Sequence, residues 1–307
     1  MITAVLLILA GLVGLGIGGE WLVRGSVGIA QRAGISNLVT GLVIVGAATS
    51  MPEMVASIQA ALIGSPEIAW GNIAGSNIAN TLLILGSAAL IAPIVLKGSG
   101  RRDALVAFVL SILIWIMAWR GMASAAFGIG LLVLLVVYII WRYRHPRPAD
   151  EEEDSDGPPM VLWKALLFFA LGVGALILGG KVLVDGAVEI AQFAGLSETV
   201  IGLTVVAIGT SLPELAASVA AALRGNSGLA LGNVVGSNIY NLLLIGGVTM
   251  TIAPFPIPRE LIDTEFPLVI GSAALVLLLC WFANRISRAV GALLVAVFVA
   301  NTVWLFF

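Results

Sequence analysis

Two short stretches of the sequence place a proline and an ionisable acid inside apolar runs. The first is "TSMPE" at Thr49–Glu53, and the second is "TSLPE" at Thr210–Glu214, 161 residues further along the chain. In a helix, side chains three or four residues apart share a face, so each stretch puts hydroxyls beside a carboxylate. Each proline lacks a backbone N–H, which frees carbonyl oxygens in the preceding turn. Each stretch therefore gathers oxygen atoms around one acid.

A second polar group follows each stretch, and its members again lie on one helical face. These residues are Ser76, Asn77 and Asn80 in the first copy, and Ser237, Asn238 and Asn241 in the second. The donors are all oxygen atoms, with no histidine or cysteine cluster, and hard cations such as Ca²⁺, Mg²⁺ and Na⁺ prefer oxygen. Two facing glutamates match a divalent charge. Without a cation they repel one another, so protons are expected to compete for them.

A single intramembrane acid has an ordinary structural interpretation, because glutamate can serve as a hydrogen-bonding residue and proline as a kink. Intramembrane acids more often mark ion paths, and two copies with the same hydroxyls and amides favour a cation site. Glu20 and Lys181 also share the 161-residue offset but differ in charge, and we interpret both as interfacial residues. Glycines at 71, 75, 232 and 236 have small-xxx-small spacing, which predicts close contact between helices.

The composition indicates a membrane protein. Hydrophobic residues make up 60% of the 307 positions and charged residues 10%, whereas a soluble domain carries roughly a quarter charged residues. Most of the eight tryptophans, Trp70 among them, fall near the ends of apolar runs, as interface anchors do. The ten predicted spans are 2–23, 38–63, 70–93, 103–119, 123–141, 161–184, 198–223, 229–253, 264–283 and 287–307.

The two halves of the chain are copies of one another. At the 161-residue offset "GNIAGSNIAN" aligns with "GNVVGSNIYN", and roughly half the positions from 38 to 86 match their partners. Five spans per half is an odd number, so the second half enters the membrane in the opposite orientation, as in many secondary transporters. We predict an all-α integral membrane protein of ten transmembrane helices in two inverted five-helix repeats, at residues 1–141 and 161–307.

Basic residues set the orientation of these spans. With the N-terminus outside, twelve Lys and Arg residues, Arg142 among them, lie in cytoplasmic connections, and three lie outside, at 120, 181 and 259. Both termini are therefore predicted to lie outside. The segment 142–160 carries a charge run and four prolines, and is predicted to be a disordered cytoplasmic linker between the halves.

The motifs "GAATSMPE" with "GNIAGSNIAN", and "AIGTSLPE" with "GNVVGSNIYN", resemble the two α-repeats of the cation/calcium antiporter superfamily. Over nearly its whole length the chain looks most like the compact prokaryotic sodium/calcium exchangers. The resemblance implies a multi-pass protein of a prokaryotic inner membrane, with ten helices and four central ion sites. It also implies that two long tilted helices, here the first and sixth spans, slide past a rigid core.

The resemblance further implies roles for individual residues. Glu53 and Glu214 would share the Ca²⁺ site with the carbonyls of Thr49 and Thr210. Flanking Na⁺ sites would use Ser50, Ser76 and the Gly46 carbonyl on one side, and Ser211, Ser237 and the Ala207 carbonyl on the other. Asn80 and Asn241 would line the middle site. Many relatives carry Asp at the position of Asn241, and the asparagines here argue against K⁺ cotransport.

We predict a secondary antiporter that exchanges Ca²⁺ for Na⁺, with cations bound between Glu53 and Glu214 near the midplane. The alternative is an H⁺/Ca²⁺ antiporter with the same glutamates, although the serines at 50, 76, 211 and 237 suit Na⁺ and are less needed for protons. A channel with a ring of acids fits an inverted repeat within one chain poorly. A non-transporting scaffold would tolerate Glu53→Gln and Glu214→Gln without effect.

Covalent catalysis is not expected, because the sequence has no nucleophile–base pair and no nucleotide motif. No cofactor and no nucleic-acid partner are predicted. The expected partners are Ca²⁺, Na⁺ or H⁺, and the lipid bilayer, and an oligomer is not required.

Overall fold

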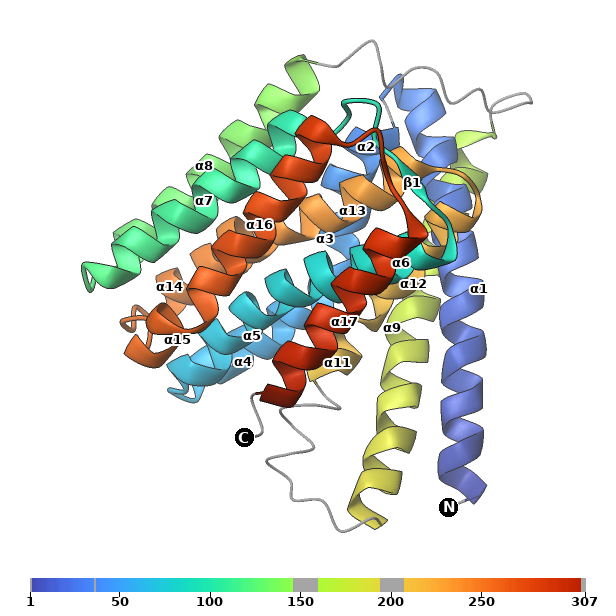
Figure 1. Ribbon diagram of the computed structural model, residues 1–307. Helices are drawn as coiled ribbons and strands as arrows, with labels where there is room; N and C mark the ends of the chain where they lie inside the picture. Colours follow the sequence, from blue (N-terminus) through green and yellow to red (C-terminus); the bar gives the residue numbers. More distant parts are fainter. Residues whose placement is uncertain (1, 36, 146–159, 194–206, 305–307) are drawn as a thin grey trace.

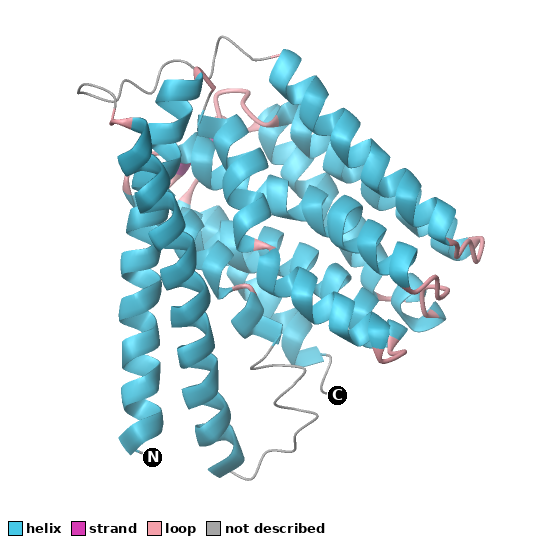
Figure 2. Ribbon diagram, turned by 180° about the vertical axis from the view of Figure 1, so that it is seen from behind, coloured by secondary structure: helices cyan, strands magenta, loops and turns pink. Residues whose placement is uncertain are grey.

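The computed structural model describes residues 2–35, 37–145, 160–193 and 207–304. These residues form helices almost throughout, joined by short loops and one pair of two-residue strands (Figures 1 and 2). Within this part of the chain, seven helices are long and apolar enough to cross a membrane, or up to eight if one bent pair counts as a single span. The protein is therefore a multi-pass membrane protein of mainly helical structure.

The elements of the first half are α1 (Ile2–Ala33), α2 (Asn37–Thr40), η1 (Gly41–Val45), α3 (Gly46–Thr49), α4 (Met51–Leu62), α5 (Pro66–Ala79), η2 (Asn80–Ile84), α6 (Leu85–Ile91), β1 (Ile94–Val95), α7 (Arg101–Trp119) and α8 (Ala125–Arg144). Those of the second half are α9 (Leu162–Phe193), α11 (Ala207–Thr210), α12 (Leu212–Leu223), α13 (Ser227–Tyr240), η5 (Asn241–Ile245), α14 (Gly246–Ile252), α15 (Arg259–Asp263), α16 (Glu265–Phe282), β2 (Arg285–Ile286) and α17 (Arg288–Trp304). The elements marked η are π-helical turns.

Helices occupy every range predicted as a span, except residues 198–206 of the seventh range, which lie outside the described residues. Helix α1 continues past residue 23 to Ala33, and α9 continues past residue 184 to Phe193. Both extensions carry charged residues, so the apolar pattern ends before the helix does. Most of the predicted linker 142–160 lies outside the described residues, and its first three residues continue α8.

Helices α1 and α9 lie side by side at one edge of the protein, and each is 32 residues long (Figures 1 and 2). Glycines bring their backbones together. A Cβ on Gly25 would lie 2.3 Å from the nitrogen of Phe169, and one on Gly172 would lie 2.4 Å from the nitrogen of Leu22. The two helices therefore meet along backbone surfaces rather than through interlocking side chains.

The centre of the protein is formed by α5–η2–α6 and α13–η5–α14. In the apolar windows of these two segments, 72% and 89% of residues are buried, against 22–39% in the other long helices. Trp70, predicted to be an interface anchor, is instead fully buried and packs on Phe266, with ring centroids 6.4 Å apart. The prediction was wrong because the end of this helix is surrounded by protein rather than by lipid headgroups.

A short antiparallel ladder connects the two halves. Ile94 lies opposite Ile286, and Val95 lies opposite Arg285. The Leu96 N–H donates to the Asn284 carbonyl at 2.8 Å. Buried backbone groups need hydrogen-bond partners, and the ladder supplies them for the loop between α6 and α7.

Arg142 was predicted to lie in a connection between spans, and the structure instead places it within α8. Its side chain is 1% exposed in α8, and its Nε lies 2.9 Å from Oδ1 of Asp103 on α7, which is 2% exposed. The Tyr138 hydroxyl donates to the same carboxylate oxygen at 3.0 Å. The pattern misled because a basic residue at the end of an apolar run usually faces water, whereas this one has an acidic partner inside the protein.

Candidate cation-binding site

The two acid-bearing stretches break their helices at the same place. In the first half α3 ends at Thr49, Ser50 leaves helical geometry with ψ 6°, and α4 begins at Met51 with a bend of 52°. In the second half α11 ends at Thr210, Ser211 has ψ 4°, and α12 begins at Leu212. Proline in the first turn explains each break, because its missing N–H leaves the carbonyl four residues earlier without its helical partner.

The break places each glutamate in the first turn of a new helix, Glu53 on α4 and Glu214 on α12. A helix N-terminus carries partial positive charge, which stabilises a carboxylate there. Both side chains are nevertheless buried, at 2% and 1% exposure. The structure therefore holds two acids inside the protein at the broken ends of equivalent helices.

Each half holds the acid of the other half. The Ser50 hydroxyl donates to Oε1 of Glu214 at 3.1 Å, and the Ser211 hydroxyl donates to Oε1 of Glu53 at 3.0 Å. This reciprocal pair of hydrogen bonds brings four of the predicted site residues together. It also fixes the orientation of both carboxylates, because one oxygen of each is held by a serine.

Several buried oxygen atoms of the predicted site have no hydrogen-bond partner within the described residues. They come in matched positions of the two halves, namely Oε2 of Glu53 and Glu214 and Oδ1 of Asn80 and Asn241, with Ser237 Oγ and Asn238 Oδ1 in addition. No described Lys or Arg forms an ion pair with either glutamate. A buried unpaired acceptor costs about 1–3 kcal/mol, and more if charged, so this set of oxygens fits a cation.

Two asparagines of this set, Asn80 and Asn241, begin π-helical turns. Asn80 is the first residue of η2, Asn241 is the first residue of η5, and a third π turn, η1, ends directly before Gly46. A π turn widens the helix by one residue and often marks a functional site. Hydrophobic periodicity carries no signal for such a turn, and the sequence analysis did not predict them.

The other predicted residues are placed as follows. Ser76 and Asn77 are buried on α5, where the Asn77 amide donates to the Ile73 carbonyl of its own helix at 2.7 Å. The Thr49 hydroxyl lies 3.1 Å from the Val45 carbonyl oxygen of its own helical segment and 3.3 Å from Oδ1 of Asn233 on α13, so it can donate to either acceptor. Thr210 is partly buried, and Ala207 begins α11.

Close backbone contact joins η1 and α3 to α13. A Cβ on Gly236 would lie 2.6 Å from the Leu42 carbonyl oxygen, which confirms the contact predicted there. A Cβ on Gly46 would lie 3.0 Å from the Ser237 nitrogen, so two predicted site residues meet across the halves. Around Gly71 and Gly75 no described atom lies within 4 Å of an added Cβ. The residue equivalent to Leu42 for these glycines is residue 203, outside the described residues.

Two asparagines that the sequence analysis did not single out donate hydrogen bonds to the backbone carbonyls of the two glutamates. Asn72 on α5 donates to the Glu53 carbonyl at 3.1 Å and to the Ser57 hydroxyl at 2.8 Å. Asn233 on α13 makes the same two bonds, to the Glu214 carbonyl at 3.2 Å and to the Ser218 hydroxyl at 2.8 Å. The signal was available, because both pairs recur at the 161-residue offset.

The chain is similar to known membrane proteins over nearly its whole length. The family described as "Sodium/calcium exchanger protein" matches residues 3–144 and 164–307. The putative antiporter CaxA of Alkalimonas amylolytica is 37% identical over 100% of this chain and 99% of its own length. The sodium/calcium exchanger MaX1 of Methanosarcina acetivorans is 31% identical over 98% of each chain. The solved structure of the sodium–calcium exchanger NCX_Mj, soaked with 10 mM Na⁺ and no Ca²⁺, is similar with a TM-score of 0.86 and 32% identity over 98% of each chain.

The fold and the matching family are those of an integral membrane transporter. The chain belongs to the sodium/calcium exchanger protein family. It is therefore a cation/Ca²⁺ antiporter, as the resemblance in the sequence implied.

Proposed function

We propose that this protein exchanges Ca²⁺ for Na⁺ by alternating access, with the cations bound between Glu53 and Glu214. The reciprocal serine bonds carry the proposal. They hold Oε1 of each glutamate and leave Oε2 of each buried without a partner among the described residues. Two carboxylates match the charge of Ca²⁺, which takes six to eight oxygen ligands.

The remaining proposed ligands are those that the resemblance to sodium/calcium exchangers implies. The Thr49 and Thr210 carbonyls would complete the Ca²⁺ site, and the Asn80 and Asn241 amide oxygens would line its middle. Asn77 and Asn238 would flank it. The Na⁺ sites would use Ser50, Ser76 and the Gly46 carbonyl, and Ser211, Ser237 and the Ala207 carbonyl.

Exchange would follow from charge. Two carboxylates that face one another in a low-dielectric interior repel. The protein would therefore change the side of the membrane to which the site is open only when cations fill the site. Ca²⁺ and Na⁺ compete for the same two acids and therefore leave and enter in turn. A gradient of one ion then drives the other uphill.

The proposed architecture is ten spans in two inverted repeats, with both termini outside. The matched helix lengths of the halves support it: α4 and α12 each have 12 residues, and α5 and α13 each have 14. A prokaryotic inner membrane is the proposed location, since relatives of this length occur in bacteria and archaea. One chain supplies both acids and both serines, so an oligomer is not required.

The test is uptake of ⁴⁵Ca²⁺ into proteoliposomes that are loaded with Na⁺ and diluted into Na⁺-free buffer, with the internal pH clamped. We expect uptake that requires internal Na⁺ and disappears in Glu53→Gln. Uptake driven only by a pH gradient would replace Na⁺ by H⁺ as the counter-ion. Ca²⁺ uptake under neither gradient would overturn the proposal.

A further inference from the structure

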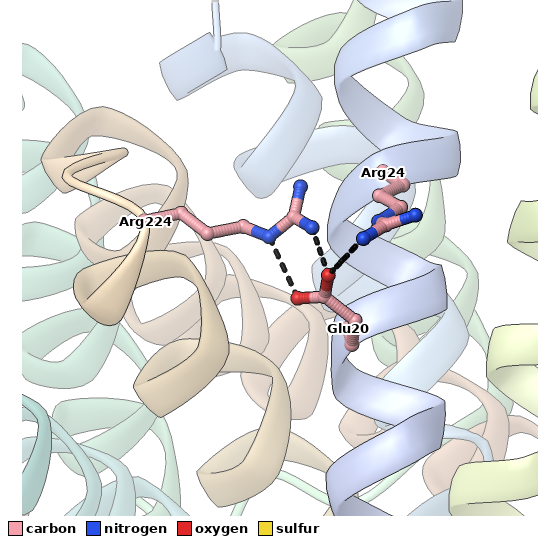
Figure 3. A network of polar contacts seen from close by, with 3 residues as sticks. All are labelled: Glu20, Arg24 and Arg224. Atoms are coloured by element: carbon pink, nitrogen blue, oxygen red, sulfur yellow. Dashed lines mark hydrogen bonds and ion pairs between the residues drawn. The ribbon is translucent and has the colours of Figure 1, made fainter.

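An ionic network joins α1 to the end of α12 (Figure 3). Arg224, the residue directly after α12, donates from Nε to Oε2 of Glu20 at 2.7 Å and from Nη2 to Oε1 of the same carboxylate. Arg24, one turn along α1, donates from Nε to Oε1 of Glu20 at 2.9 Å. The carboxylate predicted to be a simple interfacial group therefore bridges two helices that are 204 residues apart in sequence.

This network lies where the α1–α9 pair meets the centre of the protein. Beside it α1 packs on α12 through a glycine: a Cβ on Gly19 would lie 2.8 Å from the Ala216 carbonyl oxygen. A contact of this kind has little side-chain interlock to oppose movement along the helix axis. The bidentate bond from Arg224 to Glu20 is different, because charge-assisted bonds of this geometry are directional and hold one register.

The bond between Glu20 and Arg224 can break without leaving either charge buried and unpaired. If α1 moved along its axis by one turn, about 5.4 Å, Glu20 would leave Arg224 but would carry Arg24 with it on the same helix. Arg224 is 31% exposed on its side chain and Glu20 is 39% exposed, so water can replace the lost bonds. Separation of a half-exposed pair is inexpensive, unlike separation of a buried one.

The network joins the two halves, and the repeat-equivalent positions cannot form a second copy of it. The 161-residue offset pairs Glu20 with Lys181, which is exposed, and Arg224 with Ile63, which carries no charge. Two halves with equivalent contacts would give the two access states similar energies. A bond between the halves that has no equivalent copy adds a difference between these energies.

We propose that the Glu20–Arg224 bond favours the arrangement in which α1 lies against the end of α12, and so biases the transporter toward one of its two access states. The inference rests on the proposed alternating access, because it requires α1 to change its position relative to α12. It assigns Glu20 and Arg224 as positioning residues that touch no transported ion.

The experiment measures distances between spin labels on α1 and on the centre of the protein. Leu12 on α1 is 52% exposed and Ile68 on α5 is 59% exposed, so both accept a label after Leu12→Cys and Ile68→Cys in a Cys280→Ala background. We expect Glu20→Gln and Arg224→Gln each to change the ratio of two distance populations about two- to fivefold. The double variant should change it no more than either single one, because both remove the same bond.

Arg24→Gln is the matched control. It removes a partner that Glu20 keeps in both arrangements, and it should leave the ratio unchanged. Identical distance distributions in the unsubstituted labelled protein, Glu20→Gln and Arg224→Gln would overturn the inference. A response as large in Arg24→Gln would also overturn it, since the effect would then follow charge on α1 rather than the bond to α12.

The distance measurement is independent of the transport assay. Distances that respond as expected, together with absence of Na⁺-driven Ca²⁺ uptake, would reject the proposed function and keep the link. Na⁺-driven Ca²⁺ uptake with distances that do not respond would support the proposed function and reject the Glu20–Arg224 link. In transporting vesicles, Glu20→Gln should change the ratio of the Ca²⁺ half-saturation concentrations on the two membrane faces by the same two- to fivefold factor.

Discussion

Among the described residues, two pairs of ionisable side chains are buried, and the pairs differ in whether their charges are opposite or alike. Asp103 and Arg142 are of opposite charge, lie 2.9 Å apart between α7 and α8, and are 2% and 1% exposed. Glu53 and Glu214 are equally buried but carry the same charge, and no described Lys or Arg pairs with either. The first pair compensates itself within the protein. Under the proposed function, a cation from outside compensates the second pair.

The comparison shows how a buried charge reveals its role. A buried ion pair contributes little net stability, but removal of one partner is costly because the other charge is left uncompensated. Two buried acids held by serines and asparagines repel one another, and in the proposed function a bound cation compensates their charge. Substitutions should therefore separate the two pairs: one should affect folding, and the other should affect transport.

The largest expected effect is on transport. Glu53→Gln and Glu214→Gln each keep the shape of the side chain but remove half of the charge that attracts Ca²⁺. Ca²⁺ affinity should fall at least about a thousandfold in either variant, as measured by ⁴⁵Ca²⁺ uptake at increasing Ca²⁺.

The thermal unfolding temperature without Ca²⁺ should not fall in these variants, because a like-charge pair is relieved. Glu67→Gln, which changes an exposed acid in the first turn of α5, is the control and should transport normally. Uptake near the normal level in one of the two site variants would show that the two acids are not equivalent.

Asp103→Asn should affect folding instead. It leaves the Arg142 guanidinium buried without a counter-charge, which lowers the free energy of unfolding by about 3–5 kcal/mol. Thermal unfolding of the purified protein in detergent measures the loss. The Ca²⁺ half-saturation of the protein that remains folded should stay unchanged.

Replacement of both partners sharpens this prediction. Asp103→Asn together with Arg142→Met removes both charges, and it should be less destabilising than Asp103→Asn alone. If the double variant loses more stability than the single one, the pair contributes directly to folding rather than merely compensating itself.

Ser50→Ala and Ser211→Ala should have smaller effects, equal in the two halves. Each removes one charge-assisted bond that orients a glutamate, worth about 1.5 kcal/mol, and this corresponds to roughly a tenfold loss of Ca²⁺ affinity. Ser111→Ala, which removes a buried hydroxyl bonded within α7, should leave affinity unchanged. Unequal losses at Ser50 and Ser211 would mean that the halves hold the ion asymmetrically.

The smallest expected effects are on the free energy of unfolding, from substitution of the two asparagines that bond to the glutamate backbone carbonyls. Asn72→Ala and Asn233→Ala remove the bonds that brace α4 on α5 and α12 on α13, and each should lower the free energy of unfolding by about 1 kcal/mol. Asn233→Ala should cost more, because Asn233 is 1% exposed whereas Asn72 is only half-buried. Thermal unfolding of the two variants side by side tests the order, which would be reversed if burial did not decide it.

The sequence predicted the helical ranges and the acids at their breaks well. Apolar length reveals a span, and a proline beside a glutamate in a span, repeated at one offset, reveals both a kink and a charge. The ten-span count and the inverted orientation of the halves stay predictions, as do the ligand roles of individual residues.

Contacts between distant segments could not be predicted in the same way. Arg142 lay at the end of an apolar run, and nothing near it in sequence indicated Asp103 as its partner. The bond from Glu20 to Arg224 spans 204 residues and has no copy in the other half. The asparagines at 72 and 233 do have copies, but a search for cation ligands passes over amides that donate to backbone carbonyls.

The ladder between β1 and β2 has a consequence for synthesis of the protein. The N–H groups of Val95 and Leu96 find their acceptors on Ser227 and Asn284, and β1 finds its partner strand at Arg285–Ile286. None of these acceptors exists until most of the 307 residues have left the ribosome. The loop after α6 therefore lacks these hydrogen-bond partners during most of synthesis. The first half can reach its final structure only when the second half is almost complete.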